Sequence, residues 1–312
     1  MRSYSLSASA KINLYLEIIG ARPDGYHELA MVLQSIDLAD QIDLRSLLTD
    51  TICVRCDHPQ VPQDKTNLAT RAAELMAGQF SQAFAQYGGV EITIHKRIPV
   101  AAGLAGGSTD AAAVLVGLNL LWQLGLTQSE LAELAARLGS DVPFCITGGT
   151  AIATGRGDQL SALSSLDHLH VVLGKYRSLN VSTAWAYQTY RQQFSSSYVA
   201  NTPLESRAHI VHSGPIVKAI SQKDRVQIGQ LLHNDLERVV LPAYPQVLQL
   251  RQVINSTDVL GAMMSGSGPT VFALCETHEQ AQHVKRTVRA AIPDPDLDLW
   301  LARFCSTGIR VF

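Results

Sequence analysis

Apolar and polar residues alternate strictly near the start of the chain. Every second residue from Ala8 to Ile18 is apolar, and the residues between them, which include Lys11 and Asn13, are polar. A period of two is typical of a half-buried β-strand, because successive side chains of a strand point to opposite faces. We therefore expect a strand that places Lys11 and Asn13 together on the face opposite the core.

A second alternating segment, residues 90–98, leads into a glycine-rich stretch. Residues 99–110 read PVAAGLAGGSTD, and the next fourteen residues, AAAVLVGLNLLWQL, have the composition of a largely buried helix. A helix N-terminus presents unpaired N–H groups and partial positive charge, and glycines let a ligand approach the backbone closely. The pattern predicts a phosphate site. The alternative is a capped helix after a tight turn, with Ser108, Thr109 or Asp110 as the N-cap residue.

Two common phosphate-binding motifs do not fit this stretch. A Walker loop needs Gly-Lys followed by Ser or Thr, whereas the Gly-Lys pair of this chain, at 174–175, precedes a tyrosine. The glycines at 103, 106 and 107 do not have the G-x-G-x-x-G spacing of dinucleotide-binding folds.

The other patterns predict a mixture of strands and helices in irregular order, which indicates an α+β fold. A capping box, Thr127-Gln-Ser-Glu130, begins a helix, and Pro143 favours an extended turn over residues 140–144. A serine-rich stretch near 161–167 suggests a boundary between domains 1–163 and 164–312. Further expected strands are 30–47, 148–157 (a pair), 168–175, 259–264, 270–275 and 299–304, and further expected helices are 67–80, several within 182–256, and 278–292.

Composition narrows the classes of function. A chain of 312 residues with a net charge of −2 shows no basic surplus for nucleic acid, and its apolar runs are far shorter than the ~20 residues of a membrane span. No secretory signal pattern is present, and five scattered cysteines are typical of reduced thiols in a cytoplasmic protein. Cys53 and Cys56 lack a second pair, and the HExxxH spacing of His278 and His283 puts the two rings on different helix faces, so we expect no metal site.

Two charged residues are candidates for chemistry. Asp141 follows a predicted helix and precedes Val-Pro-Phe. It is therefore either a turn residue or a general base at the apolar, partly desolvated rim of a site. Lys11 is either a solvated lysine or, beside a phosphate site, a group that stabilises transferring charge. A second glycine-rich turn, SGSGP at 265–269, either lines the same cleft or is a structural turn, and we favour the turn.

Three segments, in chain order, resemble the three motifs of the GHMP kinase superfamily. They are ASAKINL at 8–14, PVAAGLAGGSTDAA at 99–112 and GAMMSGSGPT at 261–270. The first motif continues as GYHEL at 25–29, which resembles the members that act on a cytidine-containing substrate. SDVPF at 140–144 resembles their catalytic aspartate segment, and STAWAY at 182–187 resembles the segment that supplies an aromatic wall.

The resemblance implies a two-domain α+β fold with a ribosomal-protein-S5-like N-terminal domain and a ferredoxin-like C-terminal domain. It implies transfer of the γ-phosphoryl group of ATP, carried with Mg²⁺, to the 2-hydroxyl of 4-diphosphocytidyl-2-C-methylerythritol in non-mevalonate isoprenoid synthesis. Asp141 would be the base and Lys11 would orient it and stabilise charge. The ATP phosphates would contact Pro99, Val100, Ala101, Ala102, Gly103, Leu104, Ala105, Gly106, Gly107, Ser108 and Thr109, and the acceptor would contact Asn13, Tyr26, His27, Thr183 and Tyr187.

The resemblance also implies small-molecule partners only, a monomer or weak homodimer, and a cytoplasmic or organelle-stroma location. One departure matters: Ala105 replaces a glycine of the usual loop, so this residue must have a negative φ or bear strain. Two rival functions remain. A homoserine or mevalonate kinase has no pyrimidine for Tyr26 and His27 to bind, and a silent nucleotide- or RNA-binding module has no need of both Lys11 and Asp141.

Overall fold

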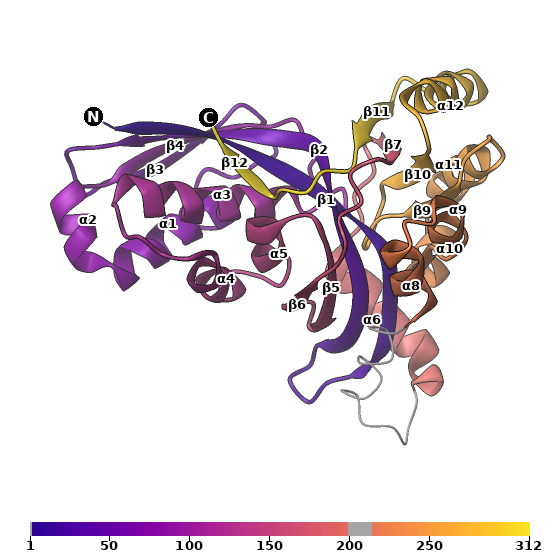
Figure 1. Cartoon of the computed structure of the whole chain (residues 1–312), viewed down its shortest axis with the longest axis horizontal. Helices are drawn as coiled ribbons and strands as arrows, with labels where there is room; N and C mark the ends of the chain where they lie inside the picture. Colours follow the sequence, from indigo (N-terminus) through magenta and orange to yellow (C-terminus); the bar gives the residue numbers. More distant parts are fainter. Residues whose placement is uncertain (1, 199–213) are drawn as a thin grey trace.

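The structure, a computed structural model, describes residues 2–198 and 214–312, so part of the helical region expected within 182–256 lies outside the described residues. Its centre is a long antiparallel hairpin of β1 (Ser3–Ala21) and β2 (His27–Ser46), which runs from the first sheet down into the rest of the molecule (Figure 1). A turn that contains Pro23, Asp24 and Gly25 joins the two strands, so the first motif and its extension lie on one hairpin.

The first sheet has eight strands in the order β12-β1-β2-β4-β3, with β5 on β2, β6 on β5 and β8 on β1. Helices α1–α5 cover one face of it (Figure 1). Leu6, Ile42 and Ile92 of the sheet pack there with Val114 and Leu118 of α3. The strands are β3 (Ile52–Cys56), β4 (Val90–His95), β5 (Thr150–Gly155), β6 (Gln159–Ala162), β8 (His233–Asn234) and β12 (Ile309–Val311), and the helices are α1 (Leu68–Gln79), α2 (Ser81–Tyr87), α3 (Gly106–Leu121), α4 (Gln128–Ala136) and α5 (Val142–Thr147).

The second sheet has four antiparallel strands in the order β11-β7-β10-β9. One face packs on α11 and α12, and the other packs on the long hairpin, where Leu173 and Phe272 meet Ile12 and Leu14. The hairpin therefore belongs to both cores. The strands are β7 (His170–Tyr176), β9 (Gly261–Met264), β10 (Val271–Cys275) and β11 (Leu297–Arg303), and the helices are α6 (Thr183–Phe194), the 3₁₀ turn η1 (Ser195–Ser197), α8 (Pro215–Ser221), α9 (Arg225–Gln230), α10 (Glu237–Ala243), α11 (Pro245–Asn255) and α12 (His278–Ala291).

Most expected elements are confirmed, including the capping box, in which Thr127 and Glu130 satisfy each other's backbone amides at the start of α4. The expectation of an extended turn over 140–144 is wrong, because α5 begins at Val142 with Pro143 in its first turn. A proline there lacks only an N–H that has no intrahelical partner, so it does not prevent the helix. β8 and β12 return to the first sheet beside β1, and the domain boundary at 163 stays a prediction.

The described part of the chain contains no helix that is both long and apolar enough to span a bilayer. The five cysteines are free thiols. No group of three histidine, cysteine or acidic side chains with the arrangement of a metal site occurs among residues 2–198 and 214–312.

Candidate active site

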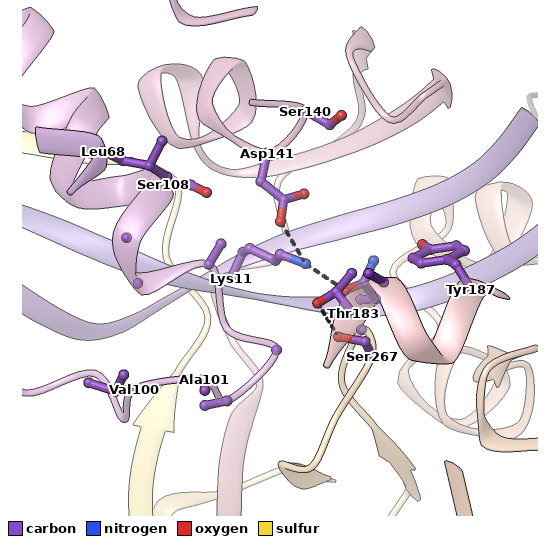
Figure 2. A pocket seen from close by; sticks show the side chains of 18 of the residues that line it. Lys11, Leu68, Val100, Ala101, Ser108, Ser140, Asp141, Thr183, Tyr187 and Ser267 are labelled. Atoms are coloured by element: carbon purple, nitrogen blue, oxygen red, sulfur yellow. Dashed lines mark hydrogen bonds and ion pairs between the residues drawn. The ribbon is translucent and has the colours of Figure 1, made fainter. Parts of the chain in front are cut away.

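A cavity of about 1070 Å³ lies where the glycine-rich stretch, the hairpin and α6 meet. Figure 2 shows Lys11 and Asp141 pointing toward one another in it, with Ser108 on one side and Tyr187 on the other. Segments far apart in sequence thus form one continuous wall. The lining includes Lys11, Asn13, Tyr26, His27, Pro99, Val100, Ala101, Ala102, Gly103, Ala105, Gly106, Gly107, Ser108, Asp141, Thr183 and Tyr187.

Lys11 lies on β1 between two irregularities of the β1–β2 ladder. The register shifts between Ser9 and Ala10 and again between Asn13 and Tyr15. Such bulges re-aim side chains and are common beside functional sites. Lys11 and Asn13 do share a face, as the alternation predicts, but both are buried in the cavity wall, with Lys11 5% exposed. The strand therefore presents the lysine to the cavity and not to bulk solvent.

The ammonium of Lys11 has two partners. Its Nζ donates to Oδ1 of Asn13 at 2.8 Å and forms an ion pair with Oδ2 of Asp141 at 3.5 Å. Asp141 is the N-cap residue of α5, so the start of that helix fixes its position. Its side chain lines the cavity and is 32% exposed. A buried cation thus fixes a carboxylate whose other side is open, which is the arrangement that a general base needs.

The glycine-rich loop has a strained backbone that matches its predicted role. Three of its residues have positive φ: Ala101 (50°), Gly103 (73°) and Ala105 (59°). Ala105 therefore bears the strain that its replacement of glycine implied. At Gly103 a Cβ atom would lie 2.3 Å from the carbonyl oxygen of Ser265, so only glycine fits there.

Helix α3 begins at Gly106, directly after this loop, and no side chain caps it. The first intrahelical bond runs from the amide of Thr109 to the carbonyl of Ala105 (2.9 Å), so the amides before it are left for a ligand. The alternative that Ser108, Thr109 or Asp110 is a structural N-cap is wrong, because these residues lie inside the helix. The uncapped terminus supports the phosphate interpretation.

Two residues of the predicted phosphate loop do not line the cavity. The side chain of Leu104 is in the core, and its carbonyl accepts from the amide of Lys11 at 3.1 Å. Thr109 is fully buried, and its hydroxyl donates to the carbonyl of Ser9 at 2.9 Å. These two contacts attach the loop to β1. The Thr109 hydroxyl therefore does not face the cavity, whereas Ser108 lines it.

A buried charge cluster lies beneath the start of α3. Lys96 forms ion pairs with Asp40 and, at 3.0 Å, with Asp110. Burial, outweighing the attraction of Lys96, raises the pKa of Asp110 to about 8, while the two carboxylates raise the pKa of Lys96 against its own burial. Asp40 also accepts from the amides of Arg97 and Ile98, at 2.6 and 2.9 Å, so the cluster fixes the strand end that leads into the loop.

The far side of the cavity is aromatic. The His27 ring lies 5.3 Å from that of Tyr187 on α6, and burial, followed by the charge of Arg191, lowers the pKa of His27 to about 4. Burial and, second, the charge of Asp141 raise the pKa of Tyr187. Tyr26 lies at the rim, 56% exposed, with Arg156 over its ring. A neutral imidazole and aromatic rings along one wall suit a flat, uncharged heterocycle.

The expectations for Asn13 and for the SGSGP segment at 265–269 are only partly met. Asn13 lines the cavity, but its side-chain oxygen is held by Lys11, so it lies at the ion pair. Thr183 shares a hydrogen bond of 2.8 Å with Ser267, which places the SGSGP segment in the cavity wall. The interpretation of that segment as only a structural turn is therefore too narrow.

Sequence reasoning missed several lining residues. Lys96, Arg156 and Arg191 are basic, and their types and spacing gave no signal, apart from the position of Lys96 just before the glycine-rich stretch. The lining residues near the start of α3 were also missed: Gln60, Val61, Pro62, Thr66, Asn67 and Leu68.

Family models match both halves of the chain. The model described as GHMP kinases N terminal domain matches residues 67–149, and that described as GHMP kinases C terminal matches residues 216–294. Full-length relatives are similar throughout. A 4-diphosphocytidyl-2-C-methyl-D-erythritol kinase of Nostoc punctiforme is 71% identical, and one of Trichodesmium erythraeum 62% identical, each over all of this chain and 99% of the relative.

Solved structures agree on the fold. A crystal structure of 4-(cytidine 5'-diphospho)-2C-methyl-D-erythritol kinase has a TM-score of 0.74 at 31% identity, covering 96% of this chain and 98% of the other. A homoserine kinase from Cytophaga hutchinsonii has a TM-score of 0.76 at 18% identity, covering 100% and 98%. At 18% identity the second likeness shows the fold alone.

Proposed function

The chain belongs to the 4-diphosphocytidyl-2-C-methyl-D-erythritol kinase family of the GHMP kinases, and from this premise we propose that Lys11 and Asp141 carry its phosphoryl transfer. The reaction moves the γ-phosphoryl group of ATP to the 2-hydroxyl of 4-diphosphocytidyl-2-C-methyl-D-erythritol, in non-mevalonate isoprenoid synthesis. A bond forms between that hydroxyl oxygen and the γ-phosphorus, the bond to the β-phosphate oxygen breaks, and ADP leaves.

The ion pair between Lys11 and Asp141 is the observation that carries this proposal. Asp141 takes the proton of the attacking hydroxyl, and Lys11, 3.5 Å away, orients the carboxylate. The lysine also neutralises charge that spreads over the transferring group. Both residues lie between the two walls of the cavity, where the γ-phosphate and the acceptor hydroxyl have to meet.

The uncapped start of α3 supports the assignment of the ATP phosphates to the glycine-rich loop. Mg²⁺ enters as part of the nucleotide substrate, and Ser108 is the loop hydroxyl that we assign to it or to the phosphates. The adenine base belongs at the end lined by Val61, Pro62 and Leu68, because an apolar slot suits its flat rings.

The cytidine end of the acceptor lies against Tyr26, His27, Thr183 and Tyr187, with cytosine between the two tyrosine rings. These rings offer stacking surfaces for a base, each worth ~1–3 kcal/mol. This placement distinguishes the chain from homoserine and mevalonate kinases of the same fold, whose acceptors contain no base. We also place the enzyme in the cytoplasm or an organelle stroma, as a monomer or weak homodimer without nucleic-acid partners.

A coupled ADP-release assay tests the function directly. The purified protein is given Mg·ATP with diphosphocytidyl methylerythritol, homoserine or mevalonate in turn. We expect turnover with the cytidyl acceptor, with a kcat/KM at least ~10³-fold above that for the other two, because their binding leaves the base-binding wall unfilled. Equal turnover with homoserine or mevalonate would contradict the proposed acceptor.

A further inference from the structure

An arginine joins the two elements that form the aromatic wall. Arg191, on α6, donates from Nη2 to the carbonyl of Gly25 at 2.7 Å and to that of Tyr26 at 3.1 Å. Both carbonyls belong to the β1–β2 turn, and Tyr187 lies one helical turn before Arg191 on the same helix. The guanidinium therefore fixes the distance between Tyr187 and the turn that carries Tyr26 and His27.

Polar atoms around this contact lack partners. Nε2 of His27, which is 7% exposed, and Nε of Arg191 are both buried without a hydrogen-bond partner in the described part of the chain. Both residues line the cavity. Buried groups without partners cost free energy, and in a binding site that cost is recovered when a ligand supplies the missing partner.

The charge of Arg191 also acts on His27. The groups that face His27 are Tyr187 and Arg191 from α6, with Tyr198 following that helix. On the hairpin itself, Arg22 is paired with Asp24 and Glu28, and Arg156, which follows β5, lies over the ring of Tyr26. Arg191 is thus the cation whose charge acts on the imidazole.

We propose that Arg191 is a positioning and specificity-determining residue, which holds the turn against α6 and so places the imidazole of His27 to recognise a neutral aminopyrimidine. The inference rests on the proposed function, because it concerns the cytidine end of the acceptor. A neutral imidazole has one donor and one acceptor, whereas imidazolium has two donors and cannot accept from an exocyclic amine. Loss of Arg191 removes both the fixed turn and one of the two causes that keep His27 neutral.

The experiment compares Arg191→Gln with Arg191→Lys and with Arg22→Gln, all in the full chain. Arg22 stabilises the same turn from outside the cavity, through its pairs with Asp24 and Glu28, so its loss loosens the turn and leaves the charge at His27 in place. KM for the cytidyl acceptor and KM for ATP are measured from pH 5.5 to 8 and divided by the wild-type values, which cancels the titration of the substrates.

For Arg191→Gln we expect the cytidyl KM to rise about 10-fold at pH 8, the loss of roughly one charge-assisted hydrogen bond, and further toward pH 5.5. Burial still lowers the pKa of His27 in this variant, but without the charge of Arg191 the imidazole gains its proton at a higher pH than in the wild type. ATP KM should change by less than about twofold. Arg191→Lys keeps the charge and should restore the pH profile but not the full affinity. Arg22→Gln should raise the cytidyl KM without changing its pH dependence.

Histidine ¹⁵N NMR gives a readout that needs no activity, with His27→Gln to assign the signal. In wild type His27 should stay neutral down to about pH 5, as its pKa of about 4 requires, and in Arg191→Gln it should titrate at higher pH.

The proposal is overturned if His27 titrates alike in both, or if Arg191→Gln and Arg22→Gln have superposable pH profiles. If the wild type shows no activity with the cytidyl acceptor, the proposed function fails, while the NMR result still tests the action of Arg191 on His27. If Arg191→Gln does not fold, Arg191→Lys with an unaltered profile supports the role of charge, and a shifted one contradicts it.

Discussion

The two ends of the cavity are built in different ways. The end that we assign to the ATP phosphates comes mainly from one continuous stretch, the glycine-rich loop and the start of α3, within residues 99–121. The end that we assign to the acceptor comes from four separate segments, namely β1 with its turn, the start of α5, the N-terminal part of α6, and the loop after β9. The first end offers mainly backbone groups, and the second offers side chains.

This difference has a physical origin. A phosphate group is bound by backbone amides at a helix terminus, so a short segment with the right dihedral angles suffices. A hydroxyl to be deprotonated and a base to be stacked need specific side chains at fixed distances, which no short segment can supply. The Lys11–Asp141 pair lies where the two ends of the cavity meet. Like the acceptor end, it depends on side chains from separate segments.

The largest effect is expected where the two ends meet. Asp141→Asn keeps the size of the side chain but cannot accept the proton, so kcat should fall about 10²–10⁴-fold with little change in ATP binding. Lys11→Ala should be similarly severe, and the double variant should lose less than the product of the two effects, because the pair acts as a unit. Single-turnover kinetics and nucleotide titration measure these quantities. Near-normal turnover of Asp141→Asn would refute its assignment as the base.

Substitutions of the two tyrosines test the acceptor end. Each change to alanine should raise the cytidyl KM by roughly 5- to 150-fold, since a base stack is worth ~1–3 kcal/mol, and leave the ATP KM unchanged. Tyr187→Ala should have the larger effect, because Tyr187 lies against His27 whereas Tyr26 is 56% exposed at the rim. Tyr187→Phe, which keeps the ring, is the matched control. An equal rise in the ATP KM would mean that the base-binding wall is misplaced.

A pair of glycines tests the phosphate end. A Cβ atom at Gly107 would lie 3.8 Å from Cδ1 of Leu68, an ordinary van der Waals contact, so Gly107→Ala should leave folding intact and place a methyl group in the cavity. We expect the ATP KM to rise about 10-fold, the lower range for one extra methyl group in a fitted site, and the cytidyl KM to stay constant.

Gly106→Ala is the contrasting variant. Its Cβ atom would lie 3.1 Å from Nζ of Lys96 and 3.2 Å from Cγ2 of Ile98, so it should lower the melting temperature more than Gly107→Ala does. An unchanged ATP KM in a folded Gly107→Ala protein would count against the position of the phosphates.

The smallest effect concerns backbone strain in the loop. Ala105 has a φ of 59°, a region that glycine enters without steric cost, so Ala105→Gly should raise the free energy of unfolding by about 0.5–1 kcal/mol. Urea denaturation measures this change. A decrease in stability would show that the side chain of Ala105 contributes more by packing than its conformation costs.

Some features of this protein follow from its sequence alone. Alternation predicts β1 and places Lys11 and Asn13 on one face, because the period of a strand is a local property of the backbone. The strand, glycine-rich loop and helix around residue 105 are predictable for the same reason, as is the capping box at Thr127. Motif order identifies the GHMP kinase family before any distance is known.

Only the tertiary structure decides the rest. The buried position of Lys11 depends on the bulges on either side of it and on α5 packing nearby, and Thr109 turns away because its hydroxyl meets β1. Arg191 shows no sequence pattern at all, since its acceptors are carbonyls about 165 residues away along the chain. Contacts between distant segments depend on how whole elements pack, and local periodicity carries no information about that packing.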